Sequence, residues 1–372
     1  MRVWLPRILV GLASVLAILA VFAIWADRQL LNTDEWVKTS SALLRNEHVQ
    51  KQSAEYLASQ VSQNVDVAAQ LQAALPPRLA PIAKPVAGAL NEVIERLAQR
   101  LLDSGAFQRL WVEANRITHR QFVNLVEGKG HVTIRGNAVV IDLKPLIGQL
   151  ATRAGISPEV VSKLPPKTGV VTVVRADQLS ALQSYADFLR RLPIVLTLLM
   201  LALFGGGVAL ARGHRRSIVL GCGFGLLAAG LGVLVLRRIV GNHVVDVLTS
   251  QGSAKPTADA VWSIATTLLA EIASTAVLIG FVLAVVAWLL GPQKWAVSLR
   301  RRMAPTLTER PGVVYGMVAT LYLALVAWGP IPALQRWFPI VVITLILAGA
   351  IIALHRSVRN EFPPDGGAYA AG

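Results

Sequence analysis

The chain has 372 residues, of which 54% are hydrophobic and only 15% are charged, against roughly 25% charged residues in an average soluble domain. This composition argues against an ordinary soluble enzyme. The formal net charge is +15, and the positions of the excess Lys and Arg residues decide between nucleic-acid binding and membrane orientation. The single cysteine, Cys222, excludes an intramolecular disulfide and a zinc-finger-type thiolate site.

Six apolar stretches have about the 20 residues that a transmembrane helix needs, and they predict a multi-pass membrane protein. The expected segments are a cytoplasmic tip with the first transmembrane helix (1–26), an extracytoplasmic domain (27–191), a transmembrane hairpin of helices 2 and 3 (192–236), an outer loop with the start of helix 4 (237–270), helix 4 (271–291), a basic cytoplasmic loop (292–312), a hairpin of helices 5 and 6 (313–354) and a cytoplasmic tail (355–372).

Prolines and flanking residues refine these expectations. Pro330 and Pro332 predict that the fifth helix ends near Trp328. The first stretch is interpreted as an uncleaved anchor rather than a signal peptide, because cleavage after Ala26 would place the bulky Ile24 three residues before the cut. For residues 237–270 the sequence leaves a re-entrant segment and a surface segment both open.

Basic residues predict the orientation of the chain. With the amino terminus inside, the cytoplasmic segments hold twelve Lys or Arg residues and the short outer loops hold four, which favours both termini in the cytoplasm. Residues 27–191 are then extracytoplasmic, and the protein is assigned to the plasma membrane. The positive charge is thereby interpreted as an orientation signal with attraction to anionic membrane lipids, and not as a nucleic-acid site.

Residues 27–191 have the patterns of a mainly helical α+β domain. The segment Asn32-Thr33-Asp34-Glu35-Trp36 predicts a helix start capped by Thr33. A second start at Asn46 is followed by one apolar face formed by Val49, Ser53, Tyr56, Leu57 and Val61.

The later part of this domain continues the pattern. An amphipathic stripe runs from Val86 through Leu90, Val93, Ile94, Leu97 and Leu101, and a further helix is expected from about Phe107 to Val126. β-Branched runs at 132–135, 139–142 and 170–175 predict a hairpin around Gly136-Asn137 and a third strand. A helix after Ala176 is expected to continue directly into the second transmembrane helix.

Two groups of charged residues are the candidate functional sites. Glu271 is the acidic candidate inside a membrane helix, and about 20 residues, or roughly 30 Å of helix, separate it from Gly291. It is therefore expected at the outer interface, as an ion pair with Arg237 or Arg238 that anchors helix ends, with a proton-coupling or substrate role as the alternative. The second group is a lipid-facing basic cluster of Lys294, Arg300, Arg301 and Arg302, which is alternatively only an orientation signal.

Small residues in the second and third helices predict close helix packing. Gly221, Gly225 and Ala229 have the four-residue spacing that favours close approach, and they predict a tight hairpin of these two helices. A flexible gate at Gly205-Gly206-Gly207 is the alternative.

The sequence contains no recognised catalytic or cofactor motif. It lacks G-x-S-x-G, H-E-x-x-H, a P-loop and an EF-hand loop. Glu113 and His119 lie six residues apart on a predicted helix and point to different faces, so a metal there would need ligands from other helices. No catalytic, cofactor-binding or metal-ligating residue is assigned, and no cofactor is expected.

Four segments together resemble an uncharacterised family of multi-pass integral membrane proteins from high-GC actinobacteria. These segments are Asn32-Thr33-Asp34-Glu35-Trp36 after the first helix, FQRLWVEANRITHRQF, the strand sequence VVIDLKPL, and ARGHRR after the second helix. The resemblance is clearest over residues 8–240. It implies an N-T-D-x-W/Y segment followed by a large extracytoplasmic domain, and it implies no catalytic motif.

The leading hypothesis is a non-enzymatic membrane protein of the cell envelope whose outer domain is a binding or scaffold module. Its expected partners are membrane lipids and a protein, lipid or envelope component bound through residues 27–191, with an oligomer left open. The alternative is a transporter, channel or lipid-handling protein, which more buried charges or interrupted helices would favour. A membrane or surface enzyme is the third hypothesis.

Overall fold

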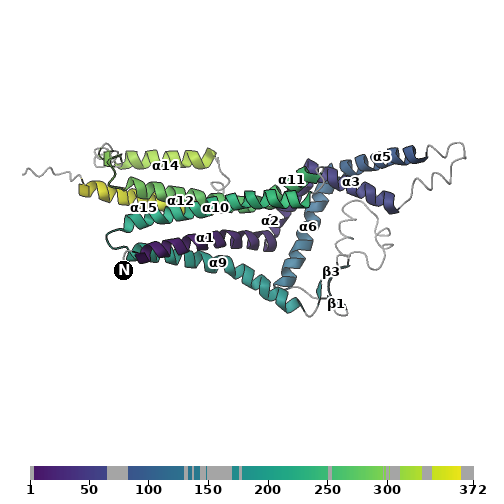
Figure 1. The fold of residues 1–372 in the computed structure, drawn as a ribbon, viewed down its shortest axis with the longest axis horizontal. Coiled ribbons are helices and arrows are strands. Elements are labelled where there is room, and N and C mark those ends of the chain that lie inside the picture. The colour runs from purple at the N-terminus through teal and green to yellow at the C-terminus, as the bar shows by residue number, and fades with distance from the viewer. Residues whose placement is uncertain are drawn as a thin grey trace, which may run out of the picture. The chain divides into compact units, whose positions relative to one another are not determined.

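The structure is a computed structural model, and it describes residues 4–64, 83–129, 133–135, 138–142, 148, 170–175, 178–249, 254–295, 297–298, 301, 311–328 and 337–361. Helices dominate these residues (Figure 1). The chain divides into two compact units: unit 1 comprises Met1–Trp25, Leu192–Arg238 and Leu268–Gly372, and unit 2 comprises Ala26–Arg191 and Ile239–Thr267.

Five helical segments among the described residues are long and apolar enough to cross a membrane by length and composition. They are α1 (Trp4–Leu31), α9 (Leu179–Leu210), α10 (Arg215–Leu248), α12 (Thr267–Leu289) and the stretch Pro339–Arg356 of α15 (Trp337–Glu361). These segments are consistent with an integral membrane protein.

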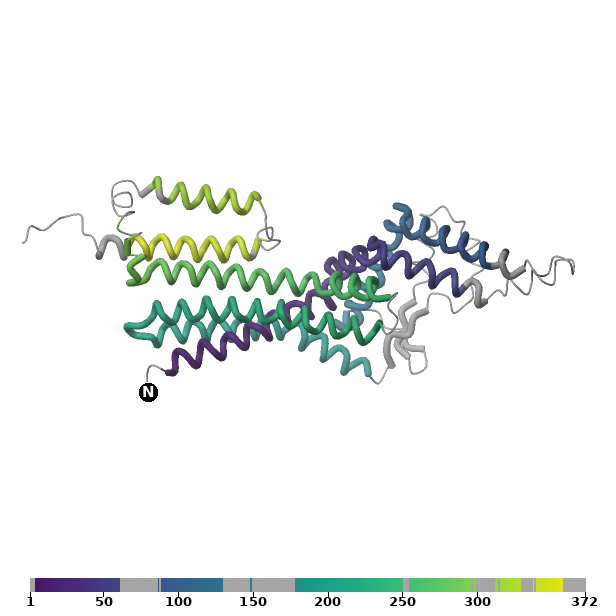
Figure 2. The backbone as a smooth tube through the Cα atoms, turned by 45° about the horizontal axis from the view of Figure 1, so that its top comes forward, coloured from purple at the N-terminus to yellow at the C-terminus, as the bar shows by residue number. Residues whose placement is uncertain are grey.

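The fifth of the six expected membrane helices is not among these candidates. It is α14 (Pro311–Trp328), whose segment Tyr315–Trp328 is apolar but below the length of the other candidates. The helix ends at Trp328, the residue at which the following prolines predicted its end. It lies beside α15 (Figure 2), where the Tyr322 hydroxyl donates to the Ile340 carbonyl oxygen at 2.9 Å.

Glycines set the packing of α10 within unit 1. A Cβ atom on Gly223 would lie 2.6 Å from the Ala284 nitrogen, and one on Gly230 would lie 2.6 Å from the Ala273 oxygen. Because residue numbers rise along α10 as they fall along α12, these two helices are antiparallel. Gly225 instead faces α1, where a Cβ atom would lie 2.1 Å from Ser14 Oγ. The small residues therefore permit close approach as expected, but their close contacts are with α12 and α1.

The sequence predicted that these glycines bring α10 close to α9. This prediction was wrong, because they approach α12 and α1 instead. The facing surfaces of α9 and α10 use larger side chains: Phe204 and Val208 pack against a cluster that contains Ile218 and Cys222. All faces of these helices are apolar, so hydrophobicity alone did not show which face each neighbour occupies.

Unit 2 is built on packed helices α2 (Thr33–Leu44), α3 (Glu47–Asn64), α5 (Ala83–Asp103), α6 (Gly105–Val126) and α11 (Lys255–Ala265). The α3 and α5 helices lie side by side, and α2 packs along α6 (Figure 2). Asn46 accepts from the His48 and Val49 backbone nitrogens at 3.1 and 3.3 Å, which confirms the helix start predicted there.

The buried face of α3 differs from the predicted one. Gln50, Ala54 and Ala58 are buried, whereas Tyr56 and Leu57 are exposed. The face is displaced by one position, because the small alanines allow the close contact with α5, where Ala54 packs near Ala98 and Leu102. The larger side chains consequently point outward.

Three short strands belong to the same unit. They are β1 (Thr133–Arg135), β2 (Ala138–Asp142) and β3 (Val170–Arg175). Their order is β1-β2-β3, both pairings are antiparallel, and the β2–β3 register shifts between Val139 and Val140. The strands fall on the three β-branched runs of the sequence.

Two helices run further than the membrane stretches predicted from sequence. The α9 helix is continuous from Leu179 to Leu210 with Pro193 inside it, which confirms the expected direct connection. The α10 helix continues past Leu236 to Leu248, so the first part of residues 237–270 is helical. After it, Lys255 on α11 forms an ion pair with Asp246 at 2.7 Å.

Candidate functional site

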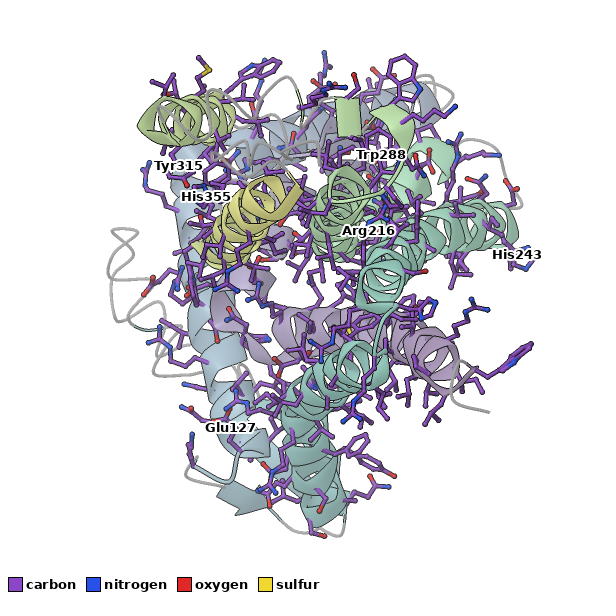
Figure 3. All side chains as sticks on the ribbon, turned by 90° about the vertical axis from the view of Figure 1, so that its left-hand side faces the viewer. Glu127, Arg216, His243, Trp288, Tyr315 and His355 are labelled. Atoms are coloured by element: carbon purple, nitrogen blue, oxygen red, sulfur yellow. The ribbon has the colours of Figure 1, made fainter. Side chains whose placement is uncertain are left out.

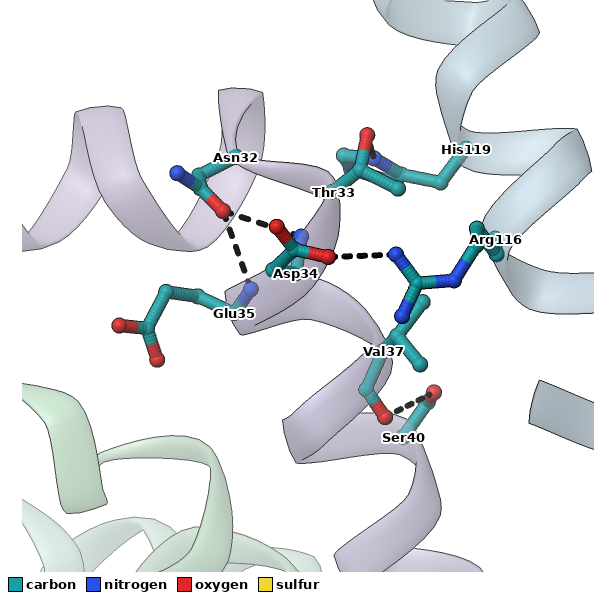
Figure 4. A network of polar contacts seen from close by, with 8 residues as sticks. All are labelled: Asn32, Thr33, Asp34, Glu35, Val37, Ser40, Arg116 and His119. Carbon is teal, nitrogen blue, oxygen red and sulfur yellow. Dashed lines mark hydrogen bonds and ion pairs between the residues drawn. The ribbon is translucent and has the colours of Figure 1, made fainter. Parts of the chain in front are cut away.

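The start of α2 carries a network of polar contacts in unit 2 (Figure 4). Asn32 is the N-cap: its Oδ1 accepts from the backbone nitrogens of Asp34 at 3.0 Å and Glu35 at 3.1 Å. Asp34 and Glu35 occupy the first turn, where acidic side chains suit the positive end of the helix. The sequence assigned the cap to Thr33, and this was wrong by one residue, because Thr33 is already helical.

Thr33 instead contacts α6 through His119. The Thr33 hydroxyl and His119 Nδ1 are 3.1 Å apart. His119 is 6% exposed, and its imidazole stacks on Trp36 with ring centroids 4.9 Å apart and lies 6.2 Å from the Phe122 ring. His119 is therefore held by an aromatic residue from each helix and by one hydroxyl.

Burial sets the protonation of His119. Desolvation lowers its pKa below the ordinary 6.5, and the Leu30 backbone has a weaker effect in the opposite direction. In the described part of the chain, His119 Nε2 is buried and has no partner that meets hydrogen-bond geometry. The neutral imidazole is thus the form that this site favours at pH 7.

Two further contacts fasten α6 to α2. Arg116, one turn before His119, forms an ion pair with Asp34 (Figure 4). At the other end of α2, Trp111 Nε1 donates to the Ser40 carbonyl oxygen at 3.3 Å. The Asn32–Asp34–Arg116–His119 network is therefore a clamp between two helices.

The α5 helix presents an apolar surface on the outside of unit 2. Five side chains, here called the α5 stripe, are each between 40% and 57% exposed: Val86, Leu90, Val93, Leu97 and Leu101. The neighbouring face of the same helix is covered, since Ala98 and Leu102 pack in the cluster shared with α3. The sequence predicted this apolar stripe, but α3 covers only part of the apolar face.

Glu271, Arg237 and Arg238 all lie in unit 1. Glu271 is half-buried in the second turn of α12, Arg237 is half-buried, and Arg238 is exposed on α10. Val233 of α10 packs in one cluster with Leu269 and Ala273 of α12. Because Arg237 lies one turn after Val233, its position along the helix axes is within about one helical turn of that of Glu271. The pairing of their charges stays a prediction.

The basic cluster is described only in part. Lys294 and Arg301 are exposed, whereas Arg300 and Arg302 lie outside the described residues. Trp295, next to Lys294, is 81% exposed. Another arginine, Arg216 on α10, is labelled in Figure 3, and its Nε donates to the Ala287 carbonyl oxygen at 2.8 Å. Contact of this cluster with lipid stays a prediction.

No group of three or more His, Cys, Asp or Glu side chains suited to a metal ion occurs in the described ranges. The sequence drew attention to His119 only as an unlikely metal ligand beside Glu113, and it missed the clamp. A signal was present, because His119 shares the helical face of Phe122, Val123 and Val126. Two of these are buried, Val123 and Val126.

Comparisons with known protein families, curated proteins and solved structures found no match to this chain. The resemblance to the actinobacterial membrane-protein family therefore stays a prediction.

Proposed function

We propose that the chain is a non-enzymatic integral protein of the plasma membrane and cell envelope, and that residues 27–191 are an extracytoplasmic binding or scaffold module. In this proposal α14 completes six membrane helices, and both termini are cytoplasmic. The distribution of Lys and Arg over the short loops supports the orientation. The strands β1, β2 and β3 support a mainly helical α+β class for the module.

The exposed α5 stripe is the observation that carries a binding role. Scattered apolar residues are normal on a protein surface, whereas a contiguous apolar patch marks an interaction site. The stripe gathers five large aliphatic side chains on one face of a single helix. An amphipathic helix with such a face is a common docking element for another protein.

The clamp supports the scaffold aspect of the proposal. It joins α2 to α6 through a capped helix start, an ion pair and a stacked histidine. The α6 helix follows α5 after one residue, Ser104, whose hydroxyl accepts from the Phe107 nitrogen at 3.2 Å. A rigid support of this kind presents a binding helix at low entropic cost.

Extraction of the tagged full-length protein from its host membrane into nanodiscs, followed by mass spectrometry, tests this function. We expect a stoichiometric protein partner, either a different protein or an untagged second copy of the chain, that is lost with Leu97→Asp and retained with Gln99→Asp, a control on the exposed polar side of α5. Melting temperatures equal to that of the wild type in both variants establish that the fold is intact. The opposite result is that a specific lipid or small molecule copurifies with the wild type and is still bound by the Leu97→Asp variant. It would overturn the proposal in favour of transport or lipid handling.

A further inference from the structure

We propose that the partner of the α5 stripe is a second copy of this chain, and that two α5 helices pair antiparallel about a two-fold axis between Val93 and Ile94. This inference rests on the proposed function, because it names the occupant of the same surface. It assigns the protein a homodimer contact within unit 2.

The spacing of the stripe is symmetric about that axis. Val86 and Leu101 are equally far from the midpoint between residues 93 and 94, and so are Leu90 and Leu97. In a two-fold contact, residue i of one copy meets residue j of the other, and j meets i. Antiparallel pairing about this midpoint therefore places Val86 opposite Leu101 and Leu90 opposite Leu97, with Val93 near Ile94 at the centre.

The intervals along the stripe also suit a helix–helix contact. Successive members are four, three, four and four residues apart, close to the alternation of three and four that keeps a seam on one side of a helix. The α3 contact uses a neighbouring face through Ala98 and Leu102. A second α5 helix can consequently dock without displacing α3.

Charge complementarity favours a second copy over a lipid surface. The sequence of α5 contains Lys84, Arg96 and Arg100 against Glu92, Glu95 and Asp103, so its formal charge is balanced. Helices that bind anionic membrane surfaces have a polar face rich in Lys and Arg. The α5 sequence lacks that excess.

Two exposed side chains beside the stripe complement each other across the same axis. Glu92 and Arg96 lie on one flank, about 40° apart at 100° per residue. In the antiparallel pair, Arg96 of one copy comes to the level of Glu92 of the other, and symmetry repeats this contact. The proposed contact thus has apolar residues along its centre and opposite charges on one rim.

Cysteine cross-linking of the full-length protein in native membranes tests the pairing. In a Cys222→Ala background, cysteines are introduced at stripe positions on two differently tagged copies and oxidised with copper phenanthroline. Val93→Cys should cross-link to itself. Val86→Cys should not, because about 22 Å would separate the two copies of residue 86 along the helix axis. Val86→Cys on one copy should cross-link with Leu101→Cys on the other, and Gln99→Cys should remain monomeric.

Other cross-linking results would contradict the proposed contact in distinguishable ways. Self-cross-linking of Val86→Cys and of Leu101→Cys would indicate a parallel pair and overturn the proposed contact. Absence of cross-links at all stripe positions would overturn the second copy as the partner. If a different protein then copurifies and is lost with Leu97→Asp, the proposed binding function stands without the homodimer. If no partner depends on Leu97, both proposals fail.

Discussion

The helices of unit 1 and those of unit 2 obtain specific packing in different ways. In unit 1, glycines on α10 bring its backbone close to α12. In unit 2, the α2–α6 contact depends on a cap, a stacked histidine and an ion pair. Where every face of a helix is apolar, the volume of its side chains determines which neighbour it packs against. Where the faces of a helix differ in polarity, specific polar contacts determine its neighbour.

Adding volume at a close contact in unit 1 should have the largest effect. In Gly223→Val, the new Cβ atom would lie 2.6 Å from the Ala284 nitrogen and 2.9 Å from its Cα. The backbone of α10 or α12 must move, which we expect to cost about 3 kcal/mol or more. The matched control is Gly232→Val, since no atom lies within 4 Å of a Cβ there. Thermal unfolding in detergent should show a much lower midpoint for Gly223→Val; equal midpoints would contradict the close-packing account.

Acid should weaken the clamp in unit 2 through His119. Its pKa is lowered by burial in the folded protein, so protonation favours the unfolded chain. The stability that depends on neutral His119 is complete above pH 6.5 and is lost as the pH falls through that value toward the lower folded pKa. Unfolding midpoints measured between pH 7.5 and 5 should fall less in His119→Gln than in the wild type. The same pH dependence in both proteins would exclude His119 as its source.

Loss of the helix cap should have a moderate effect. Asn32→Ala removes the acceptor of two backbone nitrogens at the start of α2, and we expect a loss of about 1 kcal/mol. Asn32→Asp keeps an acceptor at the same place and should be nearly neutral. Denaturant unfolding of both variants measures the difference, and a large loss in Asn32→Asp would argue against capping as the role of this residue.

The Asp34–Arg116 ion pair should contribute least. Its Asp34 side chain is 80% exposed, and exposed pairs are worth about 0–1 kcal/mol. A double-mutant cycle with Asp34→Asn and Arg116→Gln should give a coupling energy in this range that decreases at high salt. A coupling of several kcal/mol would show that the pair is shielded from water.

The same comparison explains what the sequence could predict. Apolar length predicted the five candidate membrane helices, because it depends only on composition, whereas the apolar segment of α14 is shorter than these. Asn46 predicted a helix start, because capping is local. The partner of Gly223 and the buried face of α3 were missed, since both depend on which surface a distant helix occupies. The cap was assigned to Thr33 instead of Asn32 because both residue types cap well. In the structure Asn32 accepts from the backbone nitrogens of the first turn, and the Thr33 hydroxyl contacts His119 on a distant helix.

The contact of Arg216 with the Ala287 carbonyl gives one basic residue two roles. A positive charge at the start of α10 favours one direction of insertion, and its guanidinium also satisfies an oxygen in the last turn of α12. An α12 inserted in the reverse direction would bring its other end to Arg216 and leave the Ala287 oxygen without this donor. The same arginine therefore carries a positive charge at the start of α10 and donates a hydrogen bond to the end of α12.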